Sequence, residues 1–159
     1  VDTIWATAMA AINRDDLDEV RDQIDQGRLA VVESGRGRSG LDLAAAFIAR
    51  NDYYHGWREF MSRYDLVLTP TLPCTAFPVG LDQPGSVAGR ATTYLSWTGF
   101  TYPFNATGQP AATVPCGFDA SGLPIGLQIV GRWRADSTVL RAAAAYEAMV
   151  PWAAARPPV

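Results

Sequence analysis

The sequence contains no lysine, and all thirteen of its basic residues are arginine. A mechanism that needs a lysine amine as a base or proton relay therefore cannot be completed by these 159 residues alone. Acidic residues outnumber basic ones, and the formal net charge at pH 7 is −3. That balance gives no reason to expect a nucleic-acid partner, because phosphate backbones are bound by basic surfaces.

Histidine and cysteine are also scarce, with one histidine and two cysteines in the chain. Cys74 and Cys116 lie far apart without a C-x-x-C pair, so we expect neither a disulfide framework nor a zinc site. No metal ion or cofactor is predicted, and unpaired cysteines fit a reducing, cytoplasmic location. Cys116 and His55 would form a thiol hydrolase pair if the fold brought them together. We favour the alternative that Cys116 is a small apolar residue at a strand end and that His55 is a partly exposed helix residue.

Long apolar runs are absent as well. No run approaches the roughly 20 residues that a membrane-spanning helix needs, so we expect no membrane partner. Apolar residues make up 48% of the chain and charged residues 18%, which is typical of a globular protein. A chain of this length can bury a sizeable core.

Apolar spacing predicts two short helices at the start of the chain. The first spans 3–13, with Asp2 or Thr3 as its N-cap. The second follows over 15–26 and is expected to stop at Gly27, with its acidic residues on a solvated face. The residues predicted to face inward from these helices are Ile4, Ala8, Ala11, Leu17, Val20 and Ile24.

The stretch 33–40, "ESGRGRSG", is expected to be a loop. It has the glycines and arginines to cradle an anion, but it lacks the lysine and the spacing of a phosphate loop, so we favour a helix-entry loop. Ser39 and Asp42 have the spacing of a capping box, which would open a long helix over 40–64. The residues predicted to face inward from this helix are Leu43, Phe47, Tyr54, Trp57 and Met61.

The rest of the chain, from residue 65 onward, combines strand and turn signals, which indicates an α/β protein with a mixed β-sheet flanked by helices. A buried strand is expected within 65–70 and should stop at Pro70. Residues 72–92 are rich in turn signals, and a turn or two of helix is expected over 92–99. Two adjacent strands are predicted at 111–116 and 125–131, and a closing helix over 135–150 with Asp136 or Ser137 as N-cap.

Several residues around these two strands are typical of a rigid scaffold. Asn105 and Thr107 are expected to hydrogen-bond backbone groups in a tight turn. Gly108 and Gly117 allow backbone conformations that other residues avoid. Gln128 interrupts an apolar strand and must find hydrogen-bond partners for its amide group. We interpret this region as a strand pair that braces a site built partly by other residues.

Three stretches together resemble the C-terminal third of the amidase signature family. They are "DLVLTPTLP" at 65–73, "TYPFNATGQPAATVPCGFDASGLPIGLQIVGR" at 101–132 and "LRAAAAYE" at 140–147. Their order is that of the family, and the pattern N-x-T-G-x-P followed by G-L-P-x-G-x-Q is long and specific. The resemblance covers most of residues 40–150 and implies the amidase-signature α/β fold.

The resemblance also implies what this chain is missing. Amidase-signature enzymes use a serine nucleophile, a second serine that forms a cis peptide, and a lysine that relays the proton, with an oxyanion hole in a Gly/Ser-rich segment. Neither that segment nor any lysine occurs here, so no catalytic residue is assigned. The chain is therefore expected to be the C-terminal part of an amidase, with a lead-in at 1–38, a family-like core at 39–150 and a C-terminal tail at 151–159. Alone, it is expected to be inactive.

The resemblance bears on the substrate too. Family members that serve as the A component of amidotransferases carry an aspartate in the pattern D-x-x-T-x-P-x-N, which can pair with the amino group of glutamine. Thr98 stands at that position here, flanked by Trp97 and Phe100 and followed by Thr101. A neutral hydroxyl cannot offer such charge pairing. We predict that these four residues bind a neutral or aromatic amide, although Trp97 and Phe100 could equally belong to the core.

The sequence therefore predicts a fragment of an amidase that hydrolyses a neutral amide to a carboxylic acid and ammonia. There are two alternatives: a fragment of the A component of a glutamine-dependent aminoacyl-tRNA amidotransferase, and a binding domain without catalysis. The expected partners are a small amide substrate and the N-terminal portion of the same enzyme. Because the strands at 65–70 and 125–131 are almost continuously apolar, as strands covered on both faces are, the fragment alone is expected to associate, and a homo-oligomer is possible.

Overall fold

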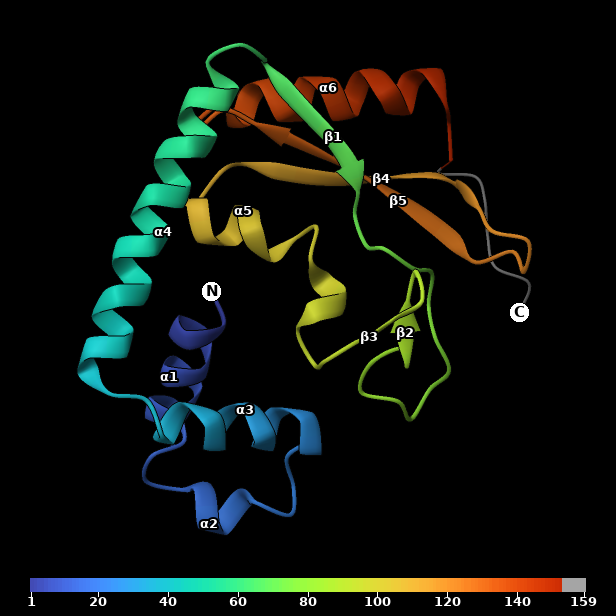
Figure 1. The fold of residues 1–159 in the computed structure, drawn as a ribbon. Coiled ribbons are helices and arrows are strands. Elements are labelled where there is room, and N and C mark those ends of the chain that lie inside the picture. Colours follow the sequence, from blue (N-terminus) through green and yellow to red (C-terminus); the bar gives the residue numbers. More distant parts are fainter. Residues whose placement is uncertain (153–159) are drawn as a thin grey trace. The chain divides into compact units, whose positions relative to one another are not determined.

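A computed structural model describes residues 1–152, so the predicted tail lies outside the described residues from 153 onward. The chain divides into two compact units, which we describe separately. The first contains residues 1–55 and 77–97, and the second contains residues 56–76 together with the chain from 98 onward. Figure 1 shows the elements of both units.

Helices α1 (Asp2–Ile12) and α3 (Gln26–Arg36) pack together in the first unit. The helices come so close that a Cβ atom at Gly35 would collide with the backbone of Ala6. Ala6 is buried, whereas Ala8 and Ala11 are exposed, so the predicted inward face of the first helix was wrong. Helix α1 faces α3 with the side that contains Ala6, because Gly35 has no side chain to keep the two helices apart. The spacing of apolar residues within α1 cannot predict this contact, because it depends on a residue of another helix. The small core of this unit contains Leu17, Leu29 and Val32, with Met9 and Ile24 packed against it.

The predicted helix over 15–26 is also wrong. Only one turn, α2 (Leu17–Val20), is helical before the chain bends and α3 begins. Asp25 is the N-cap of α3, and its Oδ1 accepts a hydrogen bond from the backbone N–H of Arg28 at 2.6 Å. Gly27 does not end a helix. It lies in the first turn of α3, where a side chain would collide with the ring of Tyr94. Much of the stretch predicted as a loop at 33–40 is likewise the end of α3.

Helix α4 (Gly40–Met61) begins as predicted at a capping box. Asp42 Oδ2 accepts from the backbone N–H of Ser39 at 2.8 Å, and the N–H of Asp42 donates to Ser39 Oγ at 3.1 Å. These hydrogen bonds from Ser39 hold the pKa of Asp42 below its ordinary value. Of the predicted inward row, Met61 is buried, but Phe47 is 46% exposed. The spacing of apolar residues shows which face of a helix can be buried, but it does not show which segment covers that face.

The second unit is built on a three-stranded sheet of β1 (Leu66–Pro70), β5 (Pro124–Gly131) and β4 (Ala111–Phe118), in that order. The predicted strand pair is confirmed: β4 and β5 are antiparallel neighbours joined by a short turn. The α/β class is confirmed too, and all strand pairs among the described residues are antiparallel. In the first unit, β2 (Ser86–Val87) and β3 (Arg90–Ala91) form a small hairpin within the predicted loop.

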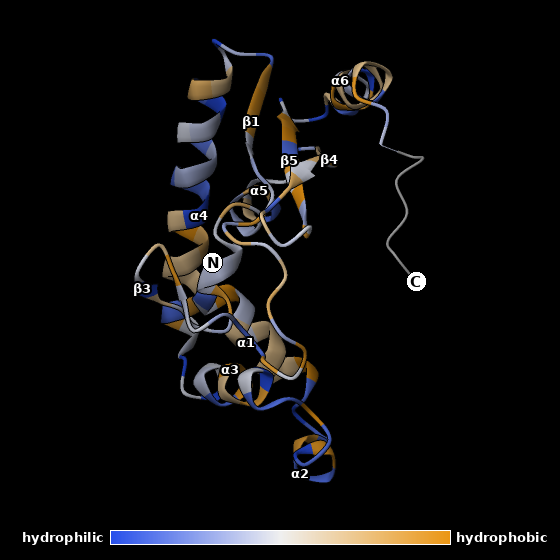
Figure 2. Ribbon diagram, turned by 90° about the vertical axis from the view of Figure 1, so that its right-hand side faces the viewer, coloured by the Kyte–Doolittle hydropathy of each residue, from blue (hydrophilic) through white to orange (hydrophobic). Residues whose placement is uncertain are grey.

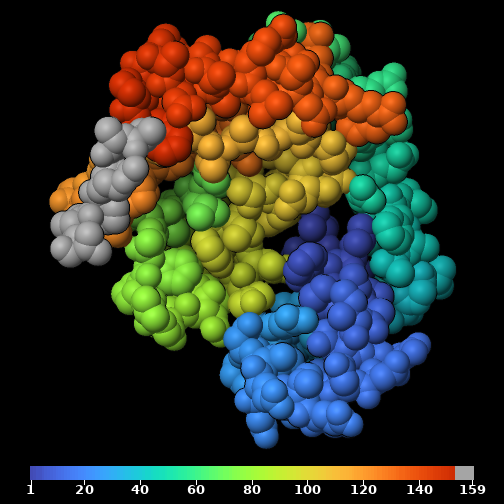
Figure 3. Space-filling view, turned by 180° about the vertical axis from the view of Figure 1, so that it is seen from behind, coloured from blue at the N-terminus to red at the C-terminus, as the bar shows by residue number. Residues whose placement is uncertain are grey.

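One face of the sheet carries the core of the second unit. Helix α6 (Asp136–Met149) lies along this face, and Figure 2 shows it on one side of β4 and β5. Val114 and Ile129 pack against Val139 of α6, and all three are at most 6% exposed. In the space-filling view the atoms of α6 form a continuous layer (Figure 3).

The connection from β5 to α6 differs from the prediction in its cap. Ala135 occupies the N-cap position and makes no side-chain cap bond, while Asp136 and Ser137 lie inside the first turn. The preceding residue, Arg134, has a left-handed backbone conformation with φ of 63°. This turn is therefore closed by backbone geometry, with the N–H of Ala135 bonded to the carbonyl of Arg132 at 2.9 Å.

Strand β1 lies at an edge of the sheet, and its exposure agrees with the expectation that this chain leaves apolar strand surface open to water. Leu68 is 60% exposed, so within this chain β1 is not covered on both faces. Central β5 is better buried, with Ile129 at 2% and Val130 at 0% exposure. The continuous apolar runs of the two strands therefore have different surroundings in the described residues.

Candidate functional site

A row of polar side chains crosses the sheet on the face opposite α6. Thr69 of β1 and Thr113 of β4 both stand directly opposite Gln128 of β5 in the strand register. Residues opposite each other in antiparallel strands project on the same side of the sheet. Thr71, just beyond β1, brings its hydroxyl against that of Thr113. The sheet thus has an apolar face and a face with a polar row.

Gln128 is the buried member of this row, with 5% of its surface exposed. Its Nε2 donates to Thr69 Oγ1 at 2.9 Å and to the carbonyl oxygen of Phe100 at 2.7 Å. The predicted need for amide partners is confirmed for this nitrogen. Because a buried amide is costly to leave without partners, the bond to Phe100 ties the loop around residue 100 to the centre of the sheet.

The loop that Gln128 holds contains three of the four predicted substrate-binding residues. Thr98 and Thr101 are half-buried, and Phe100 is 38% exposed. The carbonyl of Thr98 accepts from the N–H of Thr101 at 2.9 Å and from its hydroxyl at 3.0 Å. The loop is therefore a closed turn with a neutral surface, because residues 97–105 include no acidic or basic side chain.

Trp97, the fourth predicted residue, ends the first unit. Its half-buried ring meets the ring of Phe77 edge-on, with the centroids 5.2 Å apart. Its Nε1 donates to the carbonyl of Tyr94 at 3.1 Å. These contacts support the core interpretation for at least part of this indole, while binding of a substrate by Trp97 stays a prediction.

Helix α5 (Tyr102–Thr107) follows the loop. The tight turn predicted around Asn105 and Thr107 is instead this short helix and its C-cap. Thr107 Oγ1 lies 3.3 Å from the carbonyls of Pro103 and Phe104, which agrees with the predicted bonding to backbone. Gly108 ends the helix with φ of 71°, a left-handed conformation that favours glycine. Gly117, at a bulge in β4, has φ of 145°.

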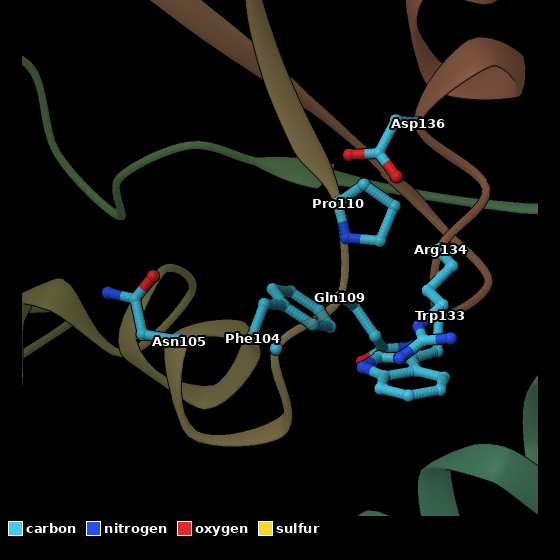
Figure 4. Close-up of a pocket in the computed structure, with 8 residues that line it drawn as sticks. Phe104, Asn105, Gln109, Pro110, Trp133, Arg134 and Asp136 are labelled. Atoms are coloured by element: carbon cyan, nitrogen blue, oxygen red, sulfur yellow. The ribbon is translucent and has the colours of Figure 1, made fainter.

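A hollow of about 550 Å³ adjoins the end of α5. Residues of α5, the segment between α5 and β4, the β5–α6 connection and the start of α6 form its walls, as Figure 4 shows. Its lining comprises Phe104, Asn105, Gly108, Gln109, Pro110, Trp133, Arg134 and Asp136. A volume of this size is within the range of small-molecule sites.

Arg134 and Trp133 form the most defined part of this lining. The guanidinium carbon of Arg134 lies 4.1 Å from the centroid of the Trp133 ring, which is a cation–π contact. Trp133 is 50% exposed. A left-handed conformation costs a residue with a side chain about 1–2 kcal/mol, so the turn holds this arginine at some expense of stability. Sequence reasoning missed the pair; the available signal was a tryptophan and an arginine shortly after an apolar strand.

The thiol and the imidazole considered for catalysis belong to different units. Cys116 is exposed on β4, with Sγ 3.5 Å from the carbonyl of Ile125. Its position near the end of β4 agrees with the strand-end placement favoured from the sequence. His55 is exposed on α4, and its ring meets that of Tyr54 edge-on. Within residues 1–152, no three His, Cys, Asp or Glu residues come together as metal ligands.

No helix of the described chain is both long enough and apolar enough to cross a membrane.

Comparisons with known proteins identify the family of this chain. An acylamidase of Rhodococcus erythropolis is 37% identical over 157 residues, which is 97% of this chain and 33% of the acylamidase. The A component of the glutamyl-tRNA(Gln) amidotransferase of Brevibacillus brevis is 50% identical over 93 residues, covering 57% of this chain and 18% of that protein. The chain thus spans about a third or less of the length of these curated relatives.

Solved structures agree. A bacterial aryl acylamidase described as an amidase signature enzyme superposes with a TM-score of 0.81 at 29% identity, covering 96% of this chain and 34% of its own. A 6-aminohexanoate cyclic dimer hydrolase complexed with substrate gives a TM-score of 0.79 at 27% identity, and the superposition covers 98% of this chain and 35% of the hydrolase. The amidase family model matches residues 2–140. This chain therefore belongs to the amidase family and has the fold of the amidase signature enzymes.

Proposed function

We propose that this chain is the C-terminal part of an amidase that hydrolyses a neutral, apolar or aromatic amide. Its role is to present the loop 98–101 to the substrate, while residues outside the chain supply the nucleophile, the lysine and the oxyanion hole. The absence of lysine from the sequence supports this division of labour. So does the acylamidase relative, which matches nearly the whole chain but extends well beyond it.

The observation that carries the substrate class is the neutral loop held by Gln128. Its hydrogen bond to the carbonyl of Phe100 fixes the loop on the polar face of the sheet. The side chains of Thr98 and Thr101 offer hydroxyl groups, and Phe100 offers a partly exposed aromatic ring. Such a surface can pack against an apolar group and hydrogen-bond an amide, but it has no carboxylate to pair with an ammonium group. We therefore assign the preference to amides without a free amino group.

The main alternative is part of an amidotransferase A component that releases ammonia from glutamine. The high identity to the Brevibacillus brevis protein over 93 residues favours this alternative locally. Thr98 argues against it, because the aspartate expected at this position in such proteins is missing. A third alternative, a domain that binds without catalysis, predicts no hydrolysis even when the upstream portion is present.

The substrate class can be tested at Thr98 in the complete enzyme that contains this chain. The unaltered enzyme should hydrolyse a neutral aryl amide with a much higher kcat/KM than glutamine. Thr98→Asp should lower kcat/KM for the aryl amide about tenfold or more, because a carboxylate beside an apolar group must be desolvated. Thr98→Val, the uncharged control of similar shape, should change it much less. A preference of the unaltered enzyme for glutamine would contradict the proposed substrate class.

The N-terminal portion of the same enzyme is the partner that the proposal requires. An unpaired edge and the exposed Leu68 on β1 and Phe118 on β4 would be available to it. Unpaired edges with apolar side chains also favour self-association. We therefore expect the isolated chain to be oligomeric in light scattering and to become monodisperse when the N-terminal portion is supplied. A stable monomer in isolation would contradict this expectation.

A further inference from the structure

We propose that the hollow between α5 and the β5–α6 connection is a binding site for a carboxylate carried on an aromatic ring. This inference does not depend on the proposed amidase reaction, because it concerns residues 104–110 and 133–136 and needs no catalytic group. The hollow is large enough for such a ligand, with a volume of about 550 Å³.

Arg134 supplies the charge. Its guanidinium lies over the Trp133 ring, so one face is held by the indole while its N–H edge can remain directed elsewhere. The planar edge of a guanidinium matches a carboxylate with two parallel hydrogen bonds. Among the described residues, Arg134 has no carboxylate partner within ion-pair distance. The stacked arginine is therefore oriented before any ligand arrives.

Gln109 and Trp133 favour a planar ligand at the same place. In Figure 4 the side chain of Gln109 lies beside the Trp133 ring and the Arg134 guanidinium. The Oε1 of Gln109 is 2.8 Å from the hydroxyl of Thr107, which leaves its amide nitrogen available as a donor. Trp133 is half exposed, and an aromatic ring can pack on the open part of the indole.

Asp136 is the group that opposes an anion. It lines the hollow but lies beyond Pro110, away from Gln109 and Trp133 in Figure 4. The carboxylate of a ligand would therefore bind at the Arg134 end, and Asp136 would weaken that binding through repulsion across the hollow. Removing the charge of Asp136 should accordingly strengthen binding.

The backbone of Arg134 provides a sharp way to separate binding from folding. At φ of 63°, glycine is more favourable than arginine, so Arg134→Gly removes the guanidinium without straining the turn. Ala88 is the matched control, since it also has a positive φ, of 50°, and lies in the other unit. Ala88→Gly relieves the same kind of strain far from the hollow in sequence and leaves its lining intact.

The test is a titration of the chain with benzoate, monitored by saturation-transfer NMR on the ligand, a measurement that does not require a monomeric protein. We expect saturable binding of benzoate and clearly weaker binding of benzamide, which has the same shape without the charge. Arg134→Gly should weaken benzoate binding about tenfold, as expected for loss of a charge-assisted hydrogen bond, with unchanged or higher thermal stability. Ala88→Gly should leave binding unchanged, and Asp136→Asn should tighten it.

Three results would overturn the proposal. They are no saturable binding of benzoate, equal binding of benzamide and benzoate, or full retention of benzoate binding by Arg134→Gly. Acetate has the carboxylate of benzoate but no aromatic ring, so it tests whether the ring contributes to binding. If it binds as tightly as benzoate, the assignment of an aromatic ligand on Trp133 is wrong.

Discussion

The two faces of the three-stranded sheet differ in what their side chains do. On the α6 face, Ile129 and Val114 pack against Val139 and exclude water. On the other face, Gln128 uses its amide to hold the carbonyl of Phe100. Adjacent residues of β5, Gln128 and Ile129, thus serve opposite faces. The α6 face stabilises the fold through hydrophobic burial, which has no preferred direction. The opposite face fixes a loop in one position through hydrogen bonds, which are directional.

The largest effect is expected on the apolar face. Ile129→Ala should lower the free energy of unfolding of the second unit by about 2–5 kcal/mol, because it leaves a cavity in a nearly closed core. Urea denaturation followed by circular dichroism measures the loss. Leu140→Ala is the matched control on α6, since Leu140 is 66% exposed and its truncation should have little effect. Equal losses for both variants would mean that α6 does not form this core.

A smaller but more local effect is expected on the polar face. Gln128→Met keeps the side-chain size and removes both hydrogen bonds that the buried amide donates, which should cost about 1–3 kcal/mol because two partly buried acceptors lose their donor. Hydrogen exchange should rise at the Thr101 amide, whose bond to the Thr98 carbonyl closes the loop. The comparison of the two faces predicts that Ile129→Ala destabilises more, while Gln128→Met loosens the loop more.

Two further variants separate hydrogen bonding from packing on the polar face. Gln128→Glu keeps the shape but replaces the donor with a carboxylate, so loop exchange should still rise. Thr113→Val changes the exposed neighbour of Gln128 in the same row and should leave exchange at Thr101 unchanged. Normal exchange in Gln128→Glu would show that the amide donor does not position the loop.

The smallest effect is a pH dependence at the turn between β4 and β5. The hydroxyl of Thr75 donates to Asp119 at 2.7 Å, and the N–H groups of Leu123 and Ser121 donate to the same carboxylate. These bonds, led by that of Thr75, hold the pKa of Asp119 below its ordinary value. A lowered folded-state pKa stabilises the fold above the unfolded value of about 3.9, and this stabilisation is lost as the pH falls through the folded value.

We therefore expect the turn to lose protection in acid, below about pH 4, and to keep it at neutral pH. Thr75→Val should raise the pKa of Asp119 toward its ordinary value, which an NMR titration of the carboxyl group measures. Asp119→Ala should remove this contribution to the pH dependence of stability altogether. An unchanged pKa in Thr75→Val would show that the hydroxyl is not the main cause of the shift.

The two sheet faces also show what the sequence could predict. The need of Gln128 for hydrogen-bond partners, the left-handed conformation of Gly108 and the capping box at Ser39 were predictable, because each depends on residue chemistry or on neighbours a few positions away. Which residues Gln128 bonds to was not predictable, because they are distant in the sequence. The role of Gly27 was not, since it depends on Tyr94 much later in the chain. The hollow at Arg134 was missed for the same reason, because its walls come from segments that only the fold brings together.

We propose that this chain carries the substrate-side loop of an amidase and that the groups that break the amide bond lie outside it. The most direct measurement is hydrolysis of a neutral aryl amide by the purified chain alone and by the same chain combined with the N-terminal portion of the enzyme. We predict only background hydrolysis by the chain alone, since loss of a nucleophile or proton relay costs several orders of magnitude, and clear turnover by the combination. Robust turnover by the chain alone, with contaminating amidase excluded, would contradict the claim.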